Sequence, residues 1–560
     1  MTDIVGRVIG TEDATPLEFW VAVAEGEYIQ LDDVVALERV LPTGEAVKVY
    51  GMVGQVRARH EGARFDSDVF LIEDGVLPAE VSEAAKVTAT RFEPEIFVPP
   101  RPGQPVVRAE GDERDRALFF DRMERRLLVG LTRANEPLYV NFEFVNGERG
   151  AHVNISGVSG VATKTSYATF LLHSMFTGQV LGAGAVNTKA LIFNVKGEDL
   201  MHLDRPNAAL DDDQLDRYRA LGLPADAFRS VGLFAPPRLD SETLRADVYS
   251  RSDVTSFCWS LAEFCHDDLL PFLFADAEDD RAQYTMVVYS VMAQLKRASA
   301  LDDGSVVIEG ETVRTFRQLA DLISAKVSSE DDGPVWAGTA IGRGTINAFV
   351  RRLNSAVRHV ERLIRGNLTD PGRHSVTVDK SQVTVVDLHN LNDRAKRFVV
   401  GVTVKRAFEQ KERQGRQGDD DLLFVVLDEL NKYAPRDGSS PIKEILLDVA
   451  ERGRSLGVIL IGAQQTASEV ERRIIANSSI RVVGRLDSAE ASREEYGFLP
   501  SVHRARATII KPGTMLVAQP ELPVPLMVEF PFPAWATRPS EVAADADRDD
   551  VPDDPFAGLR

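Results

Sequence analysis

Two short stretches of this sequence carry residue types and spacings suited to phosphate chemistry. In residues 151–178, an apolar, β-branched segment leads into a glycine-containing loop, Gly157–Thr163, and then into Lys164, Thr165 and Ser166. Apolar residues then recur at helical spacing, so the stretch predicts a strand, a loop and a helix. In such a unit the loop N–H groups surround phosphates, a lysine reaches the β and γ oxygens, and the next hydroxyl binds Mg²⁺. Lys164 and Thr165 occupy the positions for these two roles.

The loop departs from the usual phosphate-binding pattern, which has glycine directly before the lysine and again six residues before it. Thr163 and Val158 hold those positions, and glycines stand instead at Gly157 and Gly160, as if the loop had one extra residue. The backbone must therefore follow a slightly different path around a phosphate. A strand–helix turn that binds nothing is the alternative. The expected nucleotide contacts are Gly157, Val158, Ser159, Gly160, Val161, Ala162, Thr163, Lys164, Thr165 and Ser166.

The second stretch is an apolar segment, Leu422–Leu427, that ends in Asp428 and Glu429. An acid pair at the carboxyl end of a buried parallel strand suits metal-assisted phosphate hydrolysis. Asp428 would hold the Mg²⁺ shell together with Thr165, and Glu429 would orient and polarise the attacking water. An acidic turn after a core strand is the alternative. Both stretches in one chain, in this order, favour ATP hydrolysis with Mg²⁺.

Composition limits the class of protein. The chain has 560 residues, of which 44% are hydrophobic and 27% charged, as expected for a globular protein of two or three domains. No apolar run approaches the ~20 residues of a membrane span, and the start MTDIVGRVIG does not have the form of a secretory signal. The two cysteines, Cys258 and Cys265, have no Cys/His cluster around them, so we expect core thiols in a cytoplasmic protein without membrane contact. A net charge of −21 means that any nucleic acid must meet a local basic patch or a pore built by several subunits.

The N-terminal region, residues 1–98, predicts a small β-barrel. Short β-branched and aromatic segments alternate there with turn clusters, and a proline-rich linker, residues 99–105, follows them. A charged helix is then expected around Ala117–Leu128, followed by a strand at 137–144. The expected barrel segments are 4–10, 19–23, 46–60, 67–73 and 86–92.

The remainder predicts an α/β core interrupted by helices. Long helical patterns fill residues 240–375, which we interpret as a helical insertion, and the acidic end, residues 536–560, predicts a disordered tail. The two parts of the core are then residues 106–239 and 376–535. Besides the two phosphate-binding stretches, strands are expected at 189–195, 230–236, 383–391, 458–465, 481–486 and 514–519, and helices at 393–416 and 442–457.

Several motifs together resemble one family. They are IVGRVIGT at the start, the loop GVSGVATKTS, IFNVKGEDL after the second core strand, LDEL, ERGRSLGVILIGAQQ and NSSIRVVGRLD. The set is similar to bacterial HerA-type ATPases of the HerA/FtsK superfamily, over about residues 1–535. The resemblance implies a RecA-like P-loop core with an N-terminal small β-barrel and an inserted helical bundle. It also implies a homohexameric ring, double-stranded DNA in a central channel, and a partner nuclease or anti-phage effector.

The resemblance also suggests roles for residues outside the two phosphate-binding stretches. Arg454 resembles the arginine that a neighbouring subunit inserts into the ATP site, with Arg452 as the competing candidate. Gln464 or Gln465, and Gln465 by preference, would sense the γ-phosphate or the attacking water at the end of its strand.

Other polar residues leave two interpretations open. Glu198 and Asp199 are either catalytic neighbours or a helix N-terminus, and His389 is expected to be a hydrogen-bonded core residue. The arginines of residues 351–365 either line a DNA channel or form a solvated face, and the second is favoured. These arginines are Arg351, Arg352, Arg358, Arg362 and Arg365.

Two functions therefore compete at this stage. The first is an ATP-driven DNA translocase or helicase whose barrel docks a nuclease or defence effector, with the partner's footprint near Gly44–Glu45 and His60–Gly62. The second is an oligomeric scaffold that binds nucleotide to assemble and activate an effector with little motor activity. The net charge and the unusual loop favour the scaffold, whereas the acid pair, Gln465 and Arg454 favour the translocase.

Overall fold

The structure, a computed structural model, describes residues 4–158, 164–239, 244–274 and 282–542. Packing divides the chain into two units. The first unit contains residues 1–144, 156–163 and 479–530, and the second contains residues 145–155, 164–478 and 531–560. Among the helices of the described ranges, none has the length and apolar character needed to cross a bilayer.

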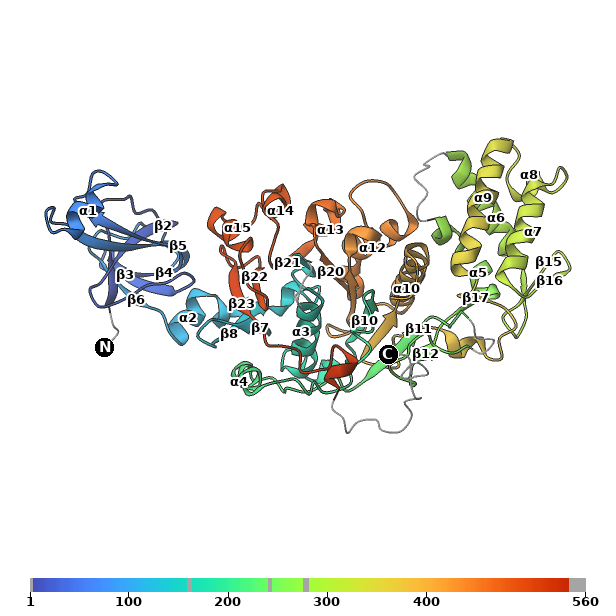
Figure 1. The fold of residues 1–560 in the computed structure, drawn as a ribbon, viewed down its shortest axis with the longest axis horizontal. Helices are drawn as coiled ribbons and strands as arrows, with labels where there is room; N and C mark the ends of the chain where they lie inside the picture. The colour runs from blue at the N-terminus through green and yellow to red at the C-terminus, as the bar shows by residue number, and fades with distance from the viewer. Residues whose placement is uncertain (1–3, 159–163, 240–243, 275–281, 543–560) are drawn as a thin grey trace. The chain divides into compact units, whose positions relative to one another are not determined.

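The first unit begins with a closed six-stranded barrel in the order β1-β2-β5-β4-β3-β6, with antiparallel neighbours (Figure 1). Alternating apolar residues of its strands, such as Val47 and Val49 in β4, pack together as an apolar core. The expected barrel is therefore present. Its strands are β1 (Ile4–Val8), β2 (Glu18–Val23), β3 (Val34–Val40), β4 (Ala46–Glu61), β5 (Glu80–Glu93) and β6 (Pro105–Arg108).

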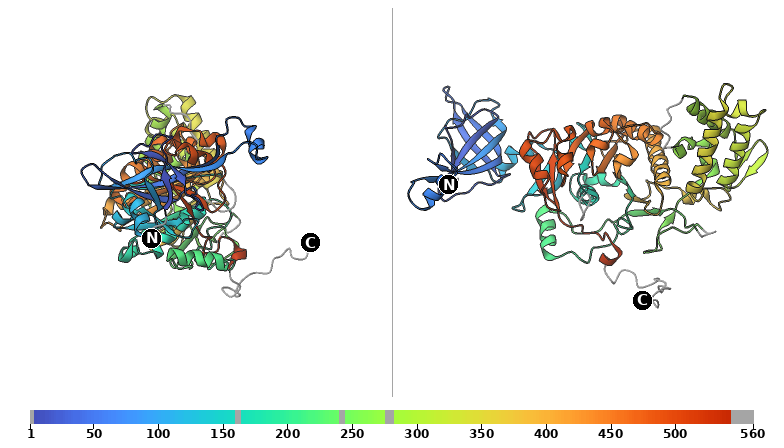
Figure 2. Two further views of the ribbon diagram at one scale, coloured as in Figure 1. Left: turned by 90° about the vertical axis from the view of Figure 1, so that its left-hand side faces the viewer. Right: turned by 45° about the horizontal axis from the view of Figure 1, so that its top comes forward.

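Strands β4 and β5 run on beyond the barrel and carry a short helix, α1 (Asp68–Glu73), between them. We call residues 61–80 the arm, and it stands out from the body of the barrel (Figure 1, Figure 2). The prediction of a strand at 67–73 is wrong. The Asp68 carboxylate accepts hydrogen bonds from the backbone N–H groups of Arg64 (2.8 Å) and Phe65 (3.0 Å), which closes a turn directly before the helix.

Two further expectations about this region need correction. Strand β6 pairs with β1 and β3, so the proline-rich residues 99–104 connect two strands of one barrel instead of leaving it. The helix expected at Ala117–Leu128 is displaced: α2 (Asp112–Ala117) comes before it, and β7 (Arg126–Leu131) replaces its second half. The left-handed backbone of Phe119 (φ 59°) ends the helical path, and the alternating burial of the residues that follow suits a strand.

The first unit also contains an antiparallel sheet in the order β21-β22-β23-β7-β8. Strands β21 and β22 were expected, whereas β23 was not. The strands of this sheet other than β7 are β8 (Pro137–Asn141), β21 (Ser478–Val483), β22 (Thr514–Ala518) and β23 (Leu526–Glu529), and helices α14 (Ser488–Ala491) and α15 (Ser501–Ala507) lie between β21 and β22 along the chain.

The second unit is built on a sheet in the order β12-β11-β18-β10-β19-β20-β9. Neighbours from β12 to β20 pair in parallel, and almost every residue of the central strands is buried, as continuous apolar runs require. Parallel pairing brings the carboxyl ends of β18, β10, β19 and β20 to one edge. Strand bounds are β9 (Ala151–Ser156), β10 (Lys189–Asn194), β11 (Val231–Ala235), β12 (Thr255–Ser256), β18 (Val383–Asp387), β19 (Leu423–Asp428) and β20 (Val458–Gln464).

Helices of the α/β core connect these strands. Helix α3 follows β9, α10 and α12 pack against each other, and the short α11 follows β19 directly. The expected mixed α/β architecture, dominated by a parallel sheet, is thus present. Helix bounds are α3 (Lys164–Thr177), α4 (Asp212–Leu221), α10 (Asp393–Gln414), α11 (Leu430–Tyr433), α12 (Pro441–Leu456) and α13 (Arg472–Ala476).

The part of residues 240–375 that the structure describes is rich in helix but not wholly helical. Residues 255–274 show a helical pattern in the sequence, but they contain β13 (Trp259–Ser260) as well as α5 (Leu261–His266). Both cysteines of this segment are buried, and burial raises the pKa of each thiol to about 12. Two small sheets, β13–β17 and β14–β15–β16, accompany the helices. The other elements are α6 (Ala282–Leu295), α7 (Phe316–Ser328), α8 (Gly333–Trp336), α9 (Arg343–Val360), β14 (Ser299–Ala300), β15 (Val306–Ile308), β16 (Glu311–Val313) and β17 (Ile364–Arg365). Of the expected tail, residues 543–560 lie outside the described residues.

Candidate functional site

The strand order brings the first helix turn after β9 to the acid pair at the end of β19. Lys164, the first residue of α3, and Asp428, the last residue of β19, are each only 4% exposed. The Thr165 hydroxyl donates a hydrogen bond to Asp428 Oδ2 over 3.1 Å. Residues that lie 263 positions apart in the sequence thus meet at one point, and their assignment to a magnesium ion stays a prediction.

A second lysine reaches the same carboxylate. Lys196 follows β10, the strand beside β19, and its Nζ lies 3.2 Å from Asp428 Oδ2. Burial lowers the pKa of Lys164, the carboxylates of Asp428 and Glu429 oppose that shift, and Lys196 adds to it. The sequence shows Lys196 at a strand end, but only the adjacency of β10 and β19 gives it a partner.

The oxygen atoms here fit a magnesium ion. Mg²⁺ prefers hard oxygen ligands and is usually held by one or two protein groups together with phosphate and water. A threonine hydroxyl and a carboxylate oxygen 3.1 Å apart form such a pair. Within the described ranges there is no cluster of three or more His, Cys, Asp or Glu side chains that could hold a metal ion alone. The donor set therefore suits a cation that arrives with a phosphate ligand.

Glu429 has an unusual backbone and an engaged side chain. Its φ of 57° and ψ of 44° are left-handed, and its N–H donates to Asp428 Oδ1 over 2.8 Å. Strained backbone of this kind is concentrated at functional sites. The carboxylate forms an ion pair with Lys432 at 2.6 Å, one turn along α11. The sequence reasoning missed Lys432, although its i,i+3 spacing from Glu429 is visible in the sequence.

Gly157 and Val158 begin the predicted phosphate loop, and both belong to the first unit. The Val158 N–H donates to the carbonyl oxygen of Arg485 over 2.7 Å. A Cβ atom on Gly157 would lie 3.3 Å from that same oxygen, so glycine permits the close approach of the two segments. Ser159, Gly160, Val161, Ala162 and Thr163 lie outside the described residues, and their contacts with phosphate stay predictions. Ser166 is half-buried in the first turn of α3.

The two glutamines at the end of β20 differ in environment. Gln464 is fully buried, and its amide donates to Asn154 Oδ1 of β9 over 2.9 Å. Gln465 is exposed directly after the strand. Breaking the buried amide pair would leave polar atoms unsatisfied, so this arrangement favours Gln465 for the sensor role. That role remains a prediction.

Both candidate arginine fingers contact groups of their own chain. Arg454 Nε donates to the carbonyl oxygen of Gly147 over 2.8 Å, and its Nη2 donates to that of Glu148. Arg452 forms an ion pair with Glu412. A residue that acts in a neighbouring subunit need not face its own site, so the finger assignment also remains a prediction.

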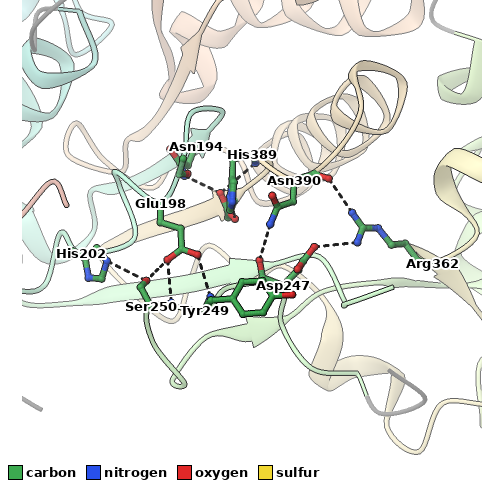
Figure 3. Close-up of polar contacts among 11 residues, drawn as sticks. Asn194, Glu198, His202, Asp247, Tyr249, Ser250, Arg362, His389 and Asn390 are labelled. Atoms are coloured by element: carbon green, nitrogen blue, oxygen red, sulfur yellow. Dashed lines mark hydrogen bonds and ion pairs between the residues drawn. The ribbon is translucent and has the colours of Figure 1, made fainter. Parts of the chain in front are cut away.

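A polar network lies at the carboxyl ends of β10, β11 and β18 (Figure 3). Asp387 is fully buried and contacts both Asn194 Nδ2 (2.8 Å) and His389 Nδ1 (2.7 Å), and this hydrogen bond raises the pKa of His389. The hydrogen bond expected for His389 is therefore present. Glu198 accepts from the N–H groups of Tyr249 (3.1 Å) and Ser250 (3.2 Å), so it holds a loop in place.

The arginines of residues 351–365 do not act as one face. Arg362 contacts the carbonyl oxygen of Pro237 (3.0 Å) and Asp247 Oδ2 (3.2 Å), and the Arg352 guanidinium lies over the Tyr284 ring. In contrast, Arg351 and Arg358 are exposed. A subset of the expected basic residues is thus available to a ligand.

Comparisons with known proteins give remote structural likeness. No family model matches the sequence, and no curated relative matches it. VirB4 of Thermoanaerobacter pseudethanolicus aligns at 14% identity over 73% of this chain and 96% of its own, with a TM-score of 0.45. The conjugative coupling protein TrwB in complex with the ATP analogue ADPNP aligns at 12% identity over 75% and 93%, with a TM-score of 0.42. The genome packaging NTPase B204 of Sulfolobus turreted icosahedral virus 2 aligns at 11% identity over 27% and 70%, with a TM-score of 0.21.

Proposed function

We propose that this protein is a P-loop ATPase with a RecA-like core that hydrolyses ATP with Mg²⁺. The observation that carries the proposal is the 3.1 Å hydrogen bond between Thr165 and Asp428 beside the buried Lys164. Lys164 would bind the β- and γ-phosphate oxygens, and Thr165 and Asp428 would hold the magnesium ion. When bound, this ion neutralises charge on the phosphates.

In this mechanism Glu429 orients the attacking water and accepts its proton. Its carboxylate follows Asp428 directly at the sheet edge, where its charge affects the pKa of Lys164. Two contacts must change first. Lys196 has to leave Asp428, because its ammonium group occupies the side of Oδ2 that a cation would use. Lys432 has to release Glu429, because an ion-paired carboxylate is a poor base.

Paired variants test this proposal. Glu429→Gln should bind ATP as the parent does and lower turnover by about 10²- to 10⁴-fold, the usual contribution of a general base. Lys164→Ala should weaken nucleotide binding itself. Glu409→Gln, which removes the carboxylate of a different Lys–Glu pair, is the matched control and should leave both unchanged. Parental turnover in Glu429→Gln would show that the base is misassigned.

We further propose that the ATPase is a HerA-type homohexameric ring that translocates or unwinds double-stranded DNA. The family resemblance and the exposed arginines of α9 support this, since a chain with net charge −21 needs a local basic surface for DNA. A nucleotide-dependent scaffold is the competing function. The ion pairs that hold Asp428 and Glu429 favour the scaffold, because residues engaged in this way are not ready for hydrolysis. If duplex DNA stimulates ATP turnover, the scaffold function is excluded. If the protein has the mass of a monomer under native conditions with nucleotide, the ring is excluded.

The barrel arm is the surface that we propose for a partner nuclease or anti-phage effector. Phe65 (72% exposed), Phe70 (67%) and Val76 (70%) project from it, and α1 contains no buried residue. Acidic residues outnumber basic ones among residues 61–80, so the partner should offer a basic rim around an apolar centre. The arm begins at one of the expected footprints, His60–Gly62.

A further inference from the structure

The outer face of the barrel carries a cavity that the proposed ATPase does not use. It has a volume of about 280 Å³, and its lining comes from β1, β2, β4, β5 and the residues that follow β1. Pockets for drug-sized ligands have volumes of roughly 300–1,000 Å³, so this cavity suits a smaller molecule or one end of a larger one.

The strand register explains why the cavity has a low floor. Arg7 of β1 lies opposite Ala22 of β2, which lies opposite Ala84 of β5. Ala84 in turn lies opposite Arg57 of β4. Residues directly opposite each other in antiparallel strands project from the same face, and this row faces outward because the next residue, Val21, belongs to the barrel core. Two alanines thus separate two arginines, and their methyl groups are too small to fill the space between them.

A third arginine stands at the next outward position of β4. Arg59 lies opposite Ser82, two residues along from the pair of Arg57 and Ala84, and it is exposed. Within the described ranges its side chain makes no hydrogen bond or ion pair, so its guanidinium N–H donors are available to a ligand. The hydroxyl groups of Thr11 and Ser82 also belong to the lining.

The other two arginines of the cavity already have contacts, and these contacts hold them in position. The Arg57 guanidinium lies 4.0 Å from the centroid of the Trp20 ring, and Arg57 Nη2 forms an ion pair with Glu12 over 3.1 Å. Arg7 Nη1 donates to the carbonyl oxygen of Gly103 over 2.9 Å. A carbonyl group is neutral, so the charge of Arg7 is not compensated by this contact.

The charges around the cavity differ in sign from those of the whole chain. Glu61 is the one carboxylate among the described lining residues, and Glu12 neutralises Arg57 from outside the lining. Three arginines against two glutamates leave one positive charge in excess, in a chain with a net charge of −21. The cavity is therefore a local site of attraction for a small anion.

We propose that this cavity binds a terminal phosphate or diphosphate group. The planar fork of arginine matches phosphate oxygens, and a tetrahedral phosphate offers acceptors in several directions, so Arg7 and Arg59 can bind it from two sides. Glu61 at the lining would repel the further phosphates of a continuous backbone, which favours an end group over a long strand. A free phosphate compound and the end of a nucleic-acid strand share this chemistry.

Hydrogen exchange of the full chain with and without inorganic pyrophosphate, at constant ionic strength, tests the site. Pyrophosphate should slow exchange in peptides that cover residues 7–11 and 55–61. Arg59→Ala should raise the pyrophosphate concentration for half-maximal protection about ten-fold, the scale of one hydrogen-bonded contact to a charged group. Arg59→Lys should raise it less, because it keeps the charge but not the fork. Arg64→Ala removes an exposed arginine outside the lining and should behave as the parent does.

A second variant tests the location of the site. Ala22→Asp puts a carboxylate on the floor and should abolish the protection, while exchange of the ligand-free barrel stays as in the parent. Absence of protection in the parent would overturn the proposal, and so would protection that survives both Arg59→Ala and Ala22→Asp. None of these measurements depends on ATP turnover, so their failure is distinct from failure of the ATPase assignment.

A short single-stranded oligonucleotide then distinguishes the two sources of phosphate. The same sequence is compared with a 5′-phosphate and with a 5′-hydroxyl group. Protection that needs the 5′-phosphate and is weakened by Arg59→Ala would assign the site to a nucleic-acid end. Equal behaviour of the two oligonucleotides, together with protection by pyrophosphate, would assign it to a free phosphate compound.

Discussion

The carboxyl edge of the parallel sheet and the N-terminal barrel use their side chains in opposite ways. At the sheet edge, buried carboxylates are paired: Asp428 contacts Thr165 and the half-exposed Lys196, and Asp387 contacts His389. The barrel has an apolar interior, and its arm exposes large apolar side chains to solvent. Burying a charge is costly unless it is paired, and exposing an apolar patch is costly unless something covers it.

The difference matches the two roles that we propose within this chain, chemistry at the sheet edge and recognition at the arm. Paired, partly desolvated charges are the arrangement that can bind phosphate and move a proton. An exposed apolar arm on a rigid barrel is the arrangement that can capture another protein. Variants at the sheet edge should therefore change ATP turnover, whereas variants of the arm should leave turnover unchanged and affect only partner capture.

The largest effect is expected from a variant that tests whether a neighbouring subunit completes the site at the sheet edge. Arg454→Ala should lower turnover about 10³-fold, the scale on which an arginine finger acts. Mixing Arg454→Ala with Glu429→Gln subunits should then restore part of the activity, because some boundaries would join an intact arginine to an intact glutamate. Absence of recovery on mixing, measured as ATP turnover at constant total protein, would confine the site to one subunit.

Acidification should weaken the parallel sheet at a buried histidine near the start of β9. His152 of β9 bridges Ala450 O and the Leu460 N–H, and burial lowers its pKa to about 4. Between pH 6.5 and 4, His152 binds a proton in the unfolded chain but stays neutral in the folded chain. The free energy of unfolding therefore falls as the pH drops through this window. At pH 5 the loss is about 2 kcal/mol.

Hydrogen exchange, corrected for intrinsic rates, should show this loss in β9 between pH 7 and pH 5. His152→Gln can keep both hydrogen bonds without titrating, so it should reduce the pH dependence. His389 has the opposite sign: Asp387 raises its pKa, so its stabilising contribution is present below pH 6.5 and disappears as the pH rises through the raised pKa. Equal pH dependence in parent and His152→Gln would contradict the assignment.

A smaller effect is expected from the lysine that competes for Asp428. Lys196→Ala should lower the Mg²⁺ concentration for half-maximal turnover about three- to five-fold, because it removes a partly exposed positive charge 3.2 Å from the carboxylate. Lys189→Ala, at the other end of β10, is the control and should not change the Mg²⁺ dependence. A higher Mg²⁺ requirement in Lys196→Ala would mean that the lysine assists the cation.

The smallest effect on turnover is expected from the arm. Phe65→Asp combined with Phe70→Asp should change turnover by less than about two-fold and stability by less than about 0.5 kcal/mol, since both side chains are exposed. The variant should no longer bind the partner nuclease or effector. Co-purification of this protein with that partner measures the loss. A large loss of turnover would mean that the arm supports the ATPase and would remove the contrast between the two regions.

Much of the core was predictable because buried parallel strands have a strong sequence signal. Leu422–Leu427 and residues 458–463 are continuous apolar runs, and both lie in central strands. The segment at 67–73 is also an apolar run, but it lies on an arm with no core to cover it. A local turn at Asp68 decided its structure, and composition could not reveal this.

The partners within the site were harder to predict than its main residues. Asp428 and Thr165 follow from motifs, but the contact of Lys196 with Asp428 depends on β10 lying beside β19, which is a property of the strand order. The burial of Gln464 similarly depends on Asn154 of a distant strand. Spacing predicts which residues reach the sheet edge, and topology determines which of them touch.

The oxygen that Lys196 and Thr165 share on Asp428 has a consequence for the end of each catalytic cycle. A carboxylate that has just lost its magnesium ion would otherwise be a bare, almost fully buried charge, and that cost would slow departure of the products. Under the proposed mechanism, Lys196 would return to its 3.2 Å contact with Asp428 when the ion leaves. The lysine that competes with cation binding would therefore also lower the cost of losing the cation with the products.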